Sequence, residues 1–188
     1  MTVLQIMSAA DAQVLLRTTD ADAIARELAP HGVHFERWET REAAPGDDVL
    51  AAYAGEVARI SETGGFRLVD VVRMRPDDTD PAWPELARAA REKFLSEHRH
   101  DEDEVRFFVD GRGCFYLHLD DRVYAVVCER GDLLSVPAGT RHWFDMGTRP
   151  EFCAIRFFQE EDGWVGDFTG DPIASTIPYL DELLAPAP

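Results

Sequence analysis

The sequence predicts a single, mainly β domain in which an N-terminal layer with helices packs on a β-barrel. The first observation is the length of 188 residues, which suits one compact domain and is short for two. The second is a C-terminal half made of short runs rich in β-branched and aromatic residues. The third is the close, regular spacing of Gly, Asp and Pro turn signals between those runs, which is typical of a barrel or a sandwich.

The first half of the chain mixes helical and strand patterns. Residues 21–32 have a helical pattern that ends in Pro-His-Gly, a stop signal. Residues 47–65 carry apolar residues at helical spacing, acidic residues at the start and a glycine pair at the end, which predicts a second helix. We expect a strand over residues 66–74 and, because a proline lies near its start, a third helix over 81–94.

The second half predicts a series of strands. Five runs have strand character, namely residues 104–111, 113–119, 122–137, 142–146 and 151–158. A loop rich in Gly, Asp and aromatic residues follows, and residues 177–184 predict a short closing helix. We therefore divide one domain into an N-terminal layer (1–95), a core of barrel strands (96–160) and a closing loop and helix (161–188).

Charge and composition exclude several classes of partner. The formal net charge of −17 repels phosphate backbones and anionic membrane surfaces, so we expect no nucleic acid and no membrane as partners. No apolar run reaches the length of a bilayer span, and residues 1–13 lack the pattern of a signal peptide. Cys114, Cys128 and Cys153 lie far apart in apolar runs and are expected to be reduced core residues. Together these features predict a cytoplasmic protein.

The segment 97–111, EHRHDEDEVRFFVDG, carries the first group of chemically informative residues. On a strand, His98 and His100 face the same side, and Glu104 shares their parity, although the acidic residues 101–103 between them are poor strand formers. Two imidazoles and one carboxylate on an interior face form a good site for a first-row transition ion, which offsets the cost of burying them. The alternative is a solvated polar edge, and this segment alone leaves both interpretations open.

The segment 131–146, GDLLSVPAGTRHWFDM, favours the metal site. Pro137 and Gly139 predict a tight turn, and His142 opens the strand that follows. This arrangement can return a third imidazole to the first segment. A lone histidine would ordinarily be a structural or surface residue, as we expect for His31, His34 and His118, which have no partner at ligand spacing.

The two segments resemble the paired motifs of the cupin superfamily. The first motif reads Gly, five residues, His-x-His, three or four residues, Glu, six residues, Gly; the chain matches it from His98 to Gly111 and departs at Glu92, where the leading glycine is expected. The second reads Gly, five residues, Pro-x-Gly, two residues, His, three residues, Asn; the chain matches it from Gly131 to His142 and departs at Met146. Both departures leave the four ligand positions intact.

Within this superfamily, the block 93–118 resembles the acireductone dioxygenase family, whose first motif also lacks the leading glycine. The resemblance covers residues 60–180 strongly and the preceding residues weakly. It implies the cupin fold and one Fe(II) or Ni(II) ion per chain, held by His98, His100, Glu104 and His142. Such a ligand set leaves two adjacent octahedral positions open.

The resemblance also implies a reaction of methionine salvage and a monomeric enzyme. The substrate is the enediol 1,2-dihydroxy-3-keto-5-methylthiopentene, whose deprotonated form chelates the metal and reacts with O2. The iron form gives formate and 4-methylthio-2-oxobutanoate. The nickel form gives formate, carbon monoxide and 3-methylthiopropanoate.

Other residues are candidates for catalysis and substrate binding. A cation at Arg106 suits an anionic substrate, although this residue can equally form an ion pair that only shapes the site. Glu97 is a candidate base or an orienting group for a histidine, the alternative being an exposed charge. Candidates for contact with the substrate are Arg106, Phe94, Phe144, Arg156 and Trp164, whereas the other phenylalanines at strand spacing, including Phe107, Phe108, Phe157 and Phe158, are expected in the core.

Two competing functions remain open from the sequence. Another cupin enzyme, such as a different dioxygenase, an oxalate-degrading enzyme or a sugar-phosphate isomerase, can use the same four ligands. A cupin that serves only as a binding module is the second alternative. A DNA-binding version should carry a basic helix-turn-helix segment and a metal-free version should lack ligands, and neither description fits this sequence.

Overall fold

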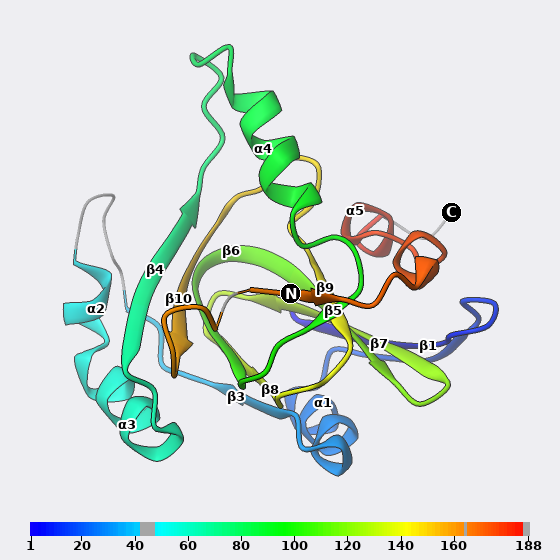
Figure 1. The fold of residues 1–188 in the computed structure, drawn as a ribbon, viewed down its shortest axis with the longest axis horizontal. Coiled ribbons are helices and arrows are strands. Elements are labelled where there is room, and N and C mark those ends of the chain that lie inside the picture. The colour runs from blue at the N-terminus through cyan, green and yellow to red at the C-terminus, as the bar shows by residue number, and fades with distance from the viewer. Residues whose placement is uncertain (42–47, 164, 186–188) are drawn as a thin grey trace.

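The computed structural model describes residues 1–41, 48–163 and 165–185, and it confirms a mainly β fold (Figure 1). The strands are β1 (Val3–Ser8), β2 (Val14–Thr18), β3 (His34–Arg37), β4 (Leu68–Met74), β5 (His98–Arg99), β6 (Glu104–Leu119), β7 (Arg122–Glu129), β8 (Asp132–Val136), β9 (His142–Asp145), β10 (Phe152–Phe158) and β11 (Asp167–Phe168). The helices are α1 (Ala21–Leu28), α2 (Val49–Ala52), α3 (Ala54–Gly64), α4 (Trp83–Glu92) and α5 (Leu180–Leu183), with 3-10 turns η1 (Ala29–His31) and η2 (Pro172–Ser175).

The long strand β6 connects two facing sheets, as its curved ribbon in Figure 1 shows. Its first half pairs with β8 and β10, and its second half pairs with β7 and β9. The change of sheet falls at Gly111, which has a φ of +67° and would place a Cβ 1.9 Å from the carbonyl oxygen of Glu151. Only glycine fits at this bend. The two strands expected over 104–111 and 113–119 are therefore halves of one strand, β6, which bends at Gly111.

Each sheet keeps free edges among the described strands. One sheet runs β11-β5-β9-β6-β7-β1-β2, and the other runs β4-β10-β6-β8-β3. Pairing between strands therefore does not close the barrel. A cluster of buried apolar side chains joins strands of both sheets, including Leu4, Phe108, Phe115 and Leu134, together with Ile24 of α1.

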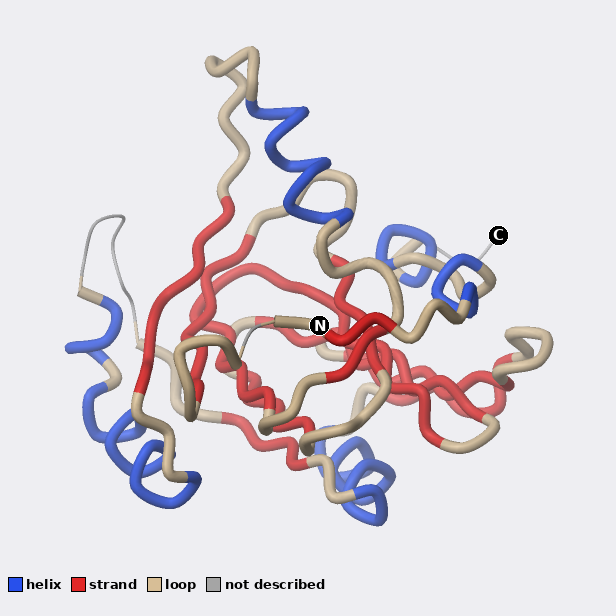
Figure 2. The backbone as a smooth tube through the Cα atoms, viewed as in Figure 1, coloured by secondary structure: helices blue, strands red, loops and turns tan. Residues whose placement is uncertain are grey.

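The N-terminal residues contribute strands to both sheets and are not confined to a separate layer. β1 pairs with β7, β3 pairs with β8, and β4 pairs with β10 (Figure 2). The sequence analysis assigned no strand to β1, β2 or β3. β1 is buried on both faces, so its sequence VLQIMS lacks the alternation that marks a half-buried strand.

The helices differ from expectation mainly at their ends. The first ends at Leu28 and continues as a 3-10 turn, which Gly32 stops with a φ of +73°. The second, expected over 47–65, is broken at the buried Tyr53 into α2 and α3, and its first expected residue lies outside the described residues. The closing helix is shorter than the expected 177–184. No helix in the described ranges has the length and apolar character to span a bilayer.

Candidate metal centre

Three imidazoles from separate strand ends converge in the structure. His98 of β5 and His142, the first residue of β9, are paired across antiparallel strands. His100 lies just beyond β5, and its carbonyl accepts a hydrogen bond from Gly139 of the expected Pro-Gly turn (2.8 Å). Each of the three buried rings offers a ligand atom, and these atoms lie within 4.8 Å of one another. The fold thus brings the two predicted motif segments together.

Backbone carbonyls fix the tautomer of all three rings. Nδ1 of His98 donates to Ser96 (2.8 Å), Nδ1 of His100 to Val165 (2.9 Å) and Nδ1 of His142 to Thr140 (2.7 Å). A carbonyl oxygen can only accept, so each Nδ1 carries the proton and each neutral ring keeps its lone pair on Nε2. This is the arrangement in which outer hydrogen bonds orient imidazoles toward a shared metal ion.

Glu104, the first residue of β6, supplies a carboxylate to the same place. Its Oε2 lies 2.7 Å from Nε2 of His142 and 3.6 Å from Nε2 of His100. Its Oε1 pairs with Arg106 at 2.7 Å. Neither Glu104 Oε2 nor His142 Nε2 has a hydrogen-bond partner, although both are buried. Two unpartnered electron-pair donors beside further imidazoles fit a divalent cation of the first transition row.

Burial and charge set the protonation of these groups. Burial lowers the pKa of His98 to about 4, with a contribution from His142. Its ring is therefore neutral at neutral pH, as a metal ligand must be. Burial alone would raise the pKa of Glu104, but the guanidinium of Arg106 opposes this effect, and that pKa lies below its ordinary value.

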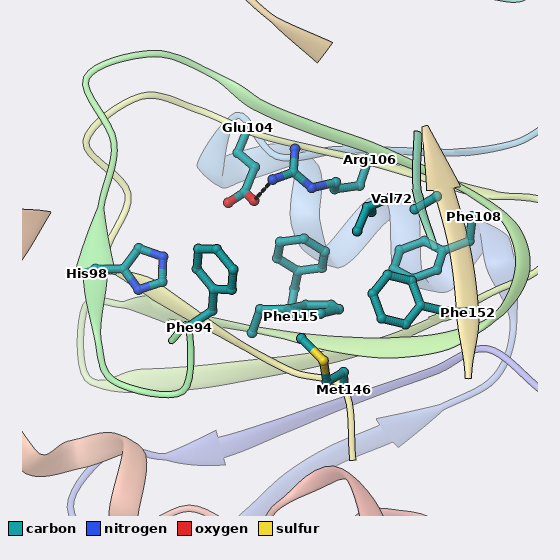
Figure 3. Close-up of a pocket in the computed structure, with 11 residues that line it drawn as sticks. Val72, Phe94, His98, Glu104, Arg106, Phe108, Phe115, Met146 and Phe152 are labelled. Carbon is teal, nitrogen blue, oxygen red and sulfur yellow. Dashed lines mark ion pairs between the residues drawn. The ribbon is translucent and has the colours of Figure 1, made fainter. Parts of the chain in front are cut away.

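An apolar pocket with a cavity volume of about 60 Å³ opens beside the candidate metal centre. In Figure 3, His98 lies at the left with Phe94 beside it, Glu104 and Arg106 lie along the upper side, and Phe108 and Phe152 lie at the right, with Met146 below. The lining residues are Val72, Phe94, His98, Glu104, Arg106, Phe108, Phe115, Phe144, Met146, Phe152 and Ala154. Such a pocket suits a small molecule with a polar head and an apolar tail.

The structure separates the predicted substrate and catalytic residues into three groups. Arg106, Phe94 and Phe144 line the pocket. Arg156 lies near Arg106, over the same ring of Phe158, but pairs with Asp70 and is not among the lining residues. Trp164 lies outside the described residues.

Glu97 is buried and is not among the residues that line the pocket. It contacts Nδ1 of His118 at 2.5 Å and accepts from the hydroxyl of Thr169 at 2.5 Å. His118 is thus a structural histidine, as expected from the sequence. The three cysteines are also free and buried, which confirms that expectation.

Several residues that line the pocket were not among the candidates expected from the sequence. Met146 and Phe144 share the strand parity of His142, and Phe108 shares that of Glu104, so strand alternation alone pointed to Met146 and Phe108. Alternation does not explain Phe115, because the bend in β6 exchanges inward and outward positions. Val72, Phe152 and Ala154 reach the pocket from β4 and β10, and their position depends on pairing that no local pattern specifies.

Comparison with known proteins identifies the family. The model of the ARD/ARD′ family matches residues 6–166, which is most of the chain. The chain belongs to the ARD/ARD′ family. It is 62% identical over 188 residues to acireductone dioxygenase 1 of Nocardia farcinica, covering 98% of this chain and 100% of the relative. It is 55% identical over 175 residues to acireductone dioxygenase of Saccharopolyspora erythraea, covering 92% of each chain.

The fold agrees with this membership. A solved ARD structure, acireductone dioxygenase from Bacillus anthracis with a cadmium ion in its active centre, matches with a TM-score of 0.73 and 29% sequence identity. The match covers 89% of this chain and 98% of the solved one. The expected cupin architecture is therefore confirmed over most of the chain.

Proposed function

We propose that this chain is an acireductone dioxygenase of methionine salvage that consumes the enediol 1,2-dihydroxy-3-keto-5-methylthiopentene together with O2. Its family membership and its relatives named acireductone dioxygenase support this proposal. The single observation that carries it in the structure is the group of three imidazoles, each oriented by a backbone carbonyl, two of which lie beside the unpartnered oxygen of Glu104. Membership of this family disfavours the oxalate-degrading, isomerase and binding-module alternatives.

We assign the metal ligands as His98, His100, Glu104 and His142, with one Fe(II) or Ni(II) ion per chain. Three nitrogens and one carboxylate oxygen suit either ion, so the ligands alone do not choose between them. The ion, when bound, supplies a Lewis acid that stabilises the enediolate and makes it reactive toward O2.

The protein's own residues position the substrate. Arg106, with its guanidinium at the polar side of the pocket, is proposed to attract the enediolate and to hold Glu104 in place through their 2.7 Å ion pair. Phe94 and Phe144 belong to the apolar wall that receives the methylthioethyl tail and excludes water around it. Glu97 is proposed to orient β5 rather than to serve as a base, because its carboxylate binds His118 and Thr169.

We also propose that the protein acts as a monomer in the cytoplasm. All assigned ligands and pocket residues come from one chain, so the site needs no second copy. The net charge of −17 disfavours nucleic acid and anionic membranes as partners. Sedimentation of the metal-loaded protein tests the oligomeric state directly.

Metal analysis of the purified protein tests the site. We expect about one iron or nickel ion per chain in the unsubstituted protein and a large loss of metal in His98→Ala. His34→Ala is the matched control, because His34 is exposed and pairs with the carboxylate of Glu36. Equal metal content in the two variants would contradict the ligand assignment.

An aerobic assay tests the reaction itself. Enediol consumption and products are followed for protein loaded separately with Fe(II) and Ni(II), and formate is expected from both. Carbon monoxide is expected from the nickel form alone. If neither form consumes the enediol faster than buffer does, the proposed activity is wrong even though the family assignment stands.

A further inference from the structure

Gly113 of β6 lies directly against the ring of Phe144 in the pocket wall. A Cβ at position 113 would lie 2.3 Å from Cζ and 2.6 Å from Cε2 of Phe144. It would also lie 3.4 Å from the ring of Phe108. Separations below 3.0 Å are essentially never seen for real Cβ atoms, so the ring occupies its place because residue 113 has no side chain.

The ring of Phe144 is confined on its other sides. Its centroid lies 4.9 Å from that of Phe115 and 5.9 Å from that of Phe152. Its backbone is held by pairing with Phe115 and by a 2.9 Å hydrogen bond to the carbonyl of Phe94. Because close-packed rings resist displacement, a methyl group at position 113 moves Phe144 toward the empty space of the pocket.

This wall is on the apolar side of the pocket. Figure 3 places Phe108 and Phe152, which adjoin Gly113 and Phe144, on the side opposite His98. Among the described lining residues, the polar side chains are His98, Glu104 and Arg106. Nothing in this wall can pair with a charged tail, so it suits an unbranched aliphatic or thioether chain.

We propose that Gly113, acting through Phe144, sets the length of the apolar tail that the pocket accepts. The inference rests on the proposed function, in which the enediol head occupies the polar end. Gly113 is a positioning residue, since it touches the substrate only through Phe144. The substrates would then be enediols whose apolar tail is no longer than the space that Phe144 leaves in the pocket.

The test compares Gly113→Ala with the unsubstituted protein on two enediols, one with the methylthioethyl tail and one with a methyl tail. Gly113 does not have a left-handed φ, so alanine suits the strand conformation at this position. We expect kcat/KM for the long tail to fall about ten-fold or more, mainly through KM, because pocket space of one methylene is worth that much. For the methyl tail we expect a change below about two-fold.

Two further variants make the result specific. Gly113→Ala combined with Phe144→Leu should recover most of the long-tail activity, because the smaller side chain returns the lost space. Gly55→Ala on α3, where a Cβ meets nothing within 4 Å, is the control for adding a methyl group to the chain. Thermal unfolding of each variant monitors the fold.

Equilibrium binding of both enediols under argon separates this inference from the proposed function. Selective loss of long-tail binding in Gly113→Ala supports the inference even if turnover is absent. Equal losses for both tails, or no loss for the long tail, overturn it. Failure of the unsubstituted protein to consume either enediol in air overturns the proposed function instead.

Discussion

Nε2 of His142 lies 2.7 Å from Oε2 of Glu104, and neither buried atom has a hydrogen-bond partner. With the ring proton fixed on Nδ1 by Thr140, two electron-pair donors face each other. They repel unless a proton or a cation lies between them. Because a divalent ion satisfies both atoms only in the folded chain, metal binding should stabilise the fold.

Removal of metal should therefore lower the Tm. An ion present at a hundred times its Kd contributes about 2.7 kcal/mol, which corresponds to about 5–10 °C for a domain of this size. We expect a strong chelator to produce this shift in the unsubstituted protein and in the exposed-site control His34→Ala. Differential scanning fluorimetry should show little response to chelator in His142→Ala; an undiminished shift in that variant would argue against His142 as a ligand.

A glycine packed on His98 should influence metal affinity. A Cβ at Gly166 would lie 3.0 Å from Cδ2 and 3.2 Å from Cγ of the His98 ring, so Gly166→Ala must displace the ring by a few tenths of an ångström. Misplaced outer contacts typically cost 10–100-fold in affinity, and we expect about ten-fold here. Competition with a chromophoric chelator measures it, with Gly55→Ala as control; the idea fails if the two variants bind metal equally.

The convergence of the proposed metal ligands could be expected from the sequence because their spacing is local and specific. His98, His100 and Glu104 lie within seven residues, and the Pro137–Gly139 turn indicates that the chain reverses direction before His142. Strand parity alone does not explain why these three side chains meet, because His100 lies beyond the end of β5 and a bend separates it from Glu104. The convergence comes from pairing of β5 with β9, which is a tertiary contact.

The pocket and the role of Glu97 could not be predicted in the same way. Phe108 and Phe115 both face the pocket although their positions differ in parity, because β6 bends at Gly111. Glu97 stands in a polar segment and was open to interpretation as an exposed charge. It is buried because His118 and Thr169, distant in sequence, enclose its carboxylate.

Loss of the Glu97 charge should affect stability more than chemistry. A buried polar group that loses its hydrogen-bond partner typically costs about 1–3 kcal/mol, so we expect Glu97→Gln to lower the free energy of unfolding by about 2 kcal/mol. In metal-loaded protein kcat should fall less than about ten-fold, since the group orients rather than transfers a proton. Urea unfolding and steady-state kinetics are compared with Glu62→Gln on the exposed face of α3. A hundred-fold loss of kcat with intact stability would identify Glu97 as a base.

Asp145 should be the main anchor of the C-terminal segment. This fully buried carboxylate accepts from Arg91 at 2.7 and 3.1 Å and from the backbone amides of Gly147 (2.8 Å) and Leu180 (2.9 Å). An amide in its place cannot accept all four bonds, so Asp145→Asn should lower the free energy of unfolding by about 3 kcal/mol. Glu85→Gln, which removes an exposed pair with Arg88, should have no measurable effect in the same urea titration. Equal midpoints for both variants would refute the anchoring role.

Substitution of Arg106 should distinguish substrate binding from mere support of Glu104. The guanidinium pairs with Glu104 at 2.7 Å and lies over the ring of Phe158 at 5.3 Å, at the polar side of the pocket. We expect Arg106→Gln to lower kcat/KM for the enediol about 100-fold, because a charge-assisted hydrogen bond to the enediolate is lost.

Arg106→Lys should recover about ten-fold of that loss, since lysine restores the charge without the planar fork. Bound metal is measured in every sample, and rates are expressed per metal ion. If both variants regain the unsubstituted kcat/KM after this correction, Arg106 acts only by holding Glu104 in the metal centre. If kcat/KM per bound metal ion stays low in Arg106→Gln and is intermediate in Arg106→Lys, the positive charge of residue 106 acts on the substrate. A residue that only held Glu104 in place would not change the rate of protein that carries its full amount of metal.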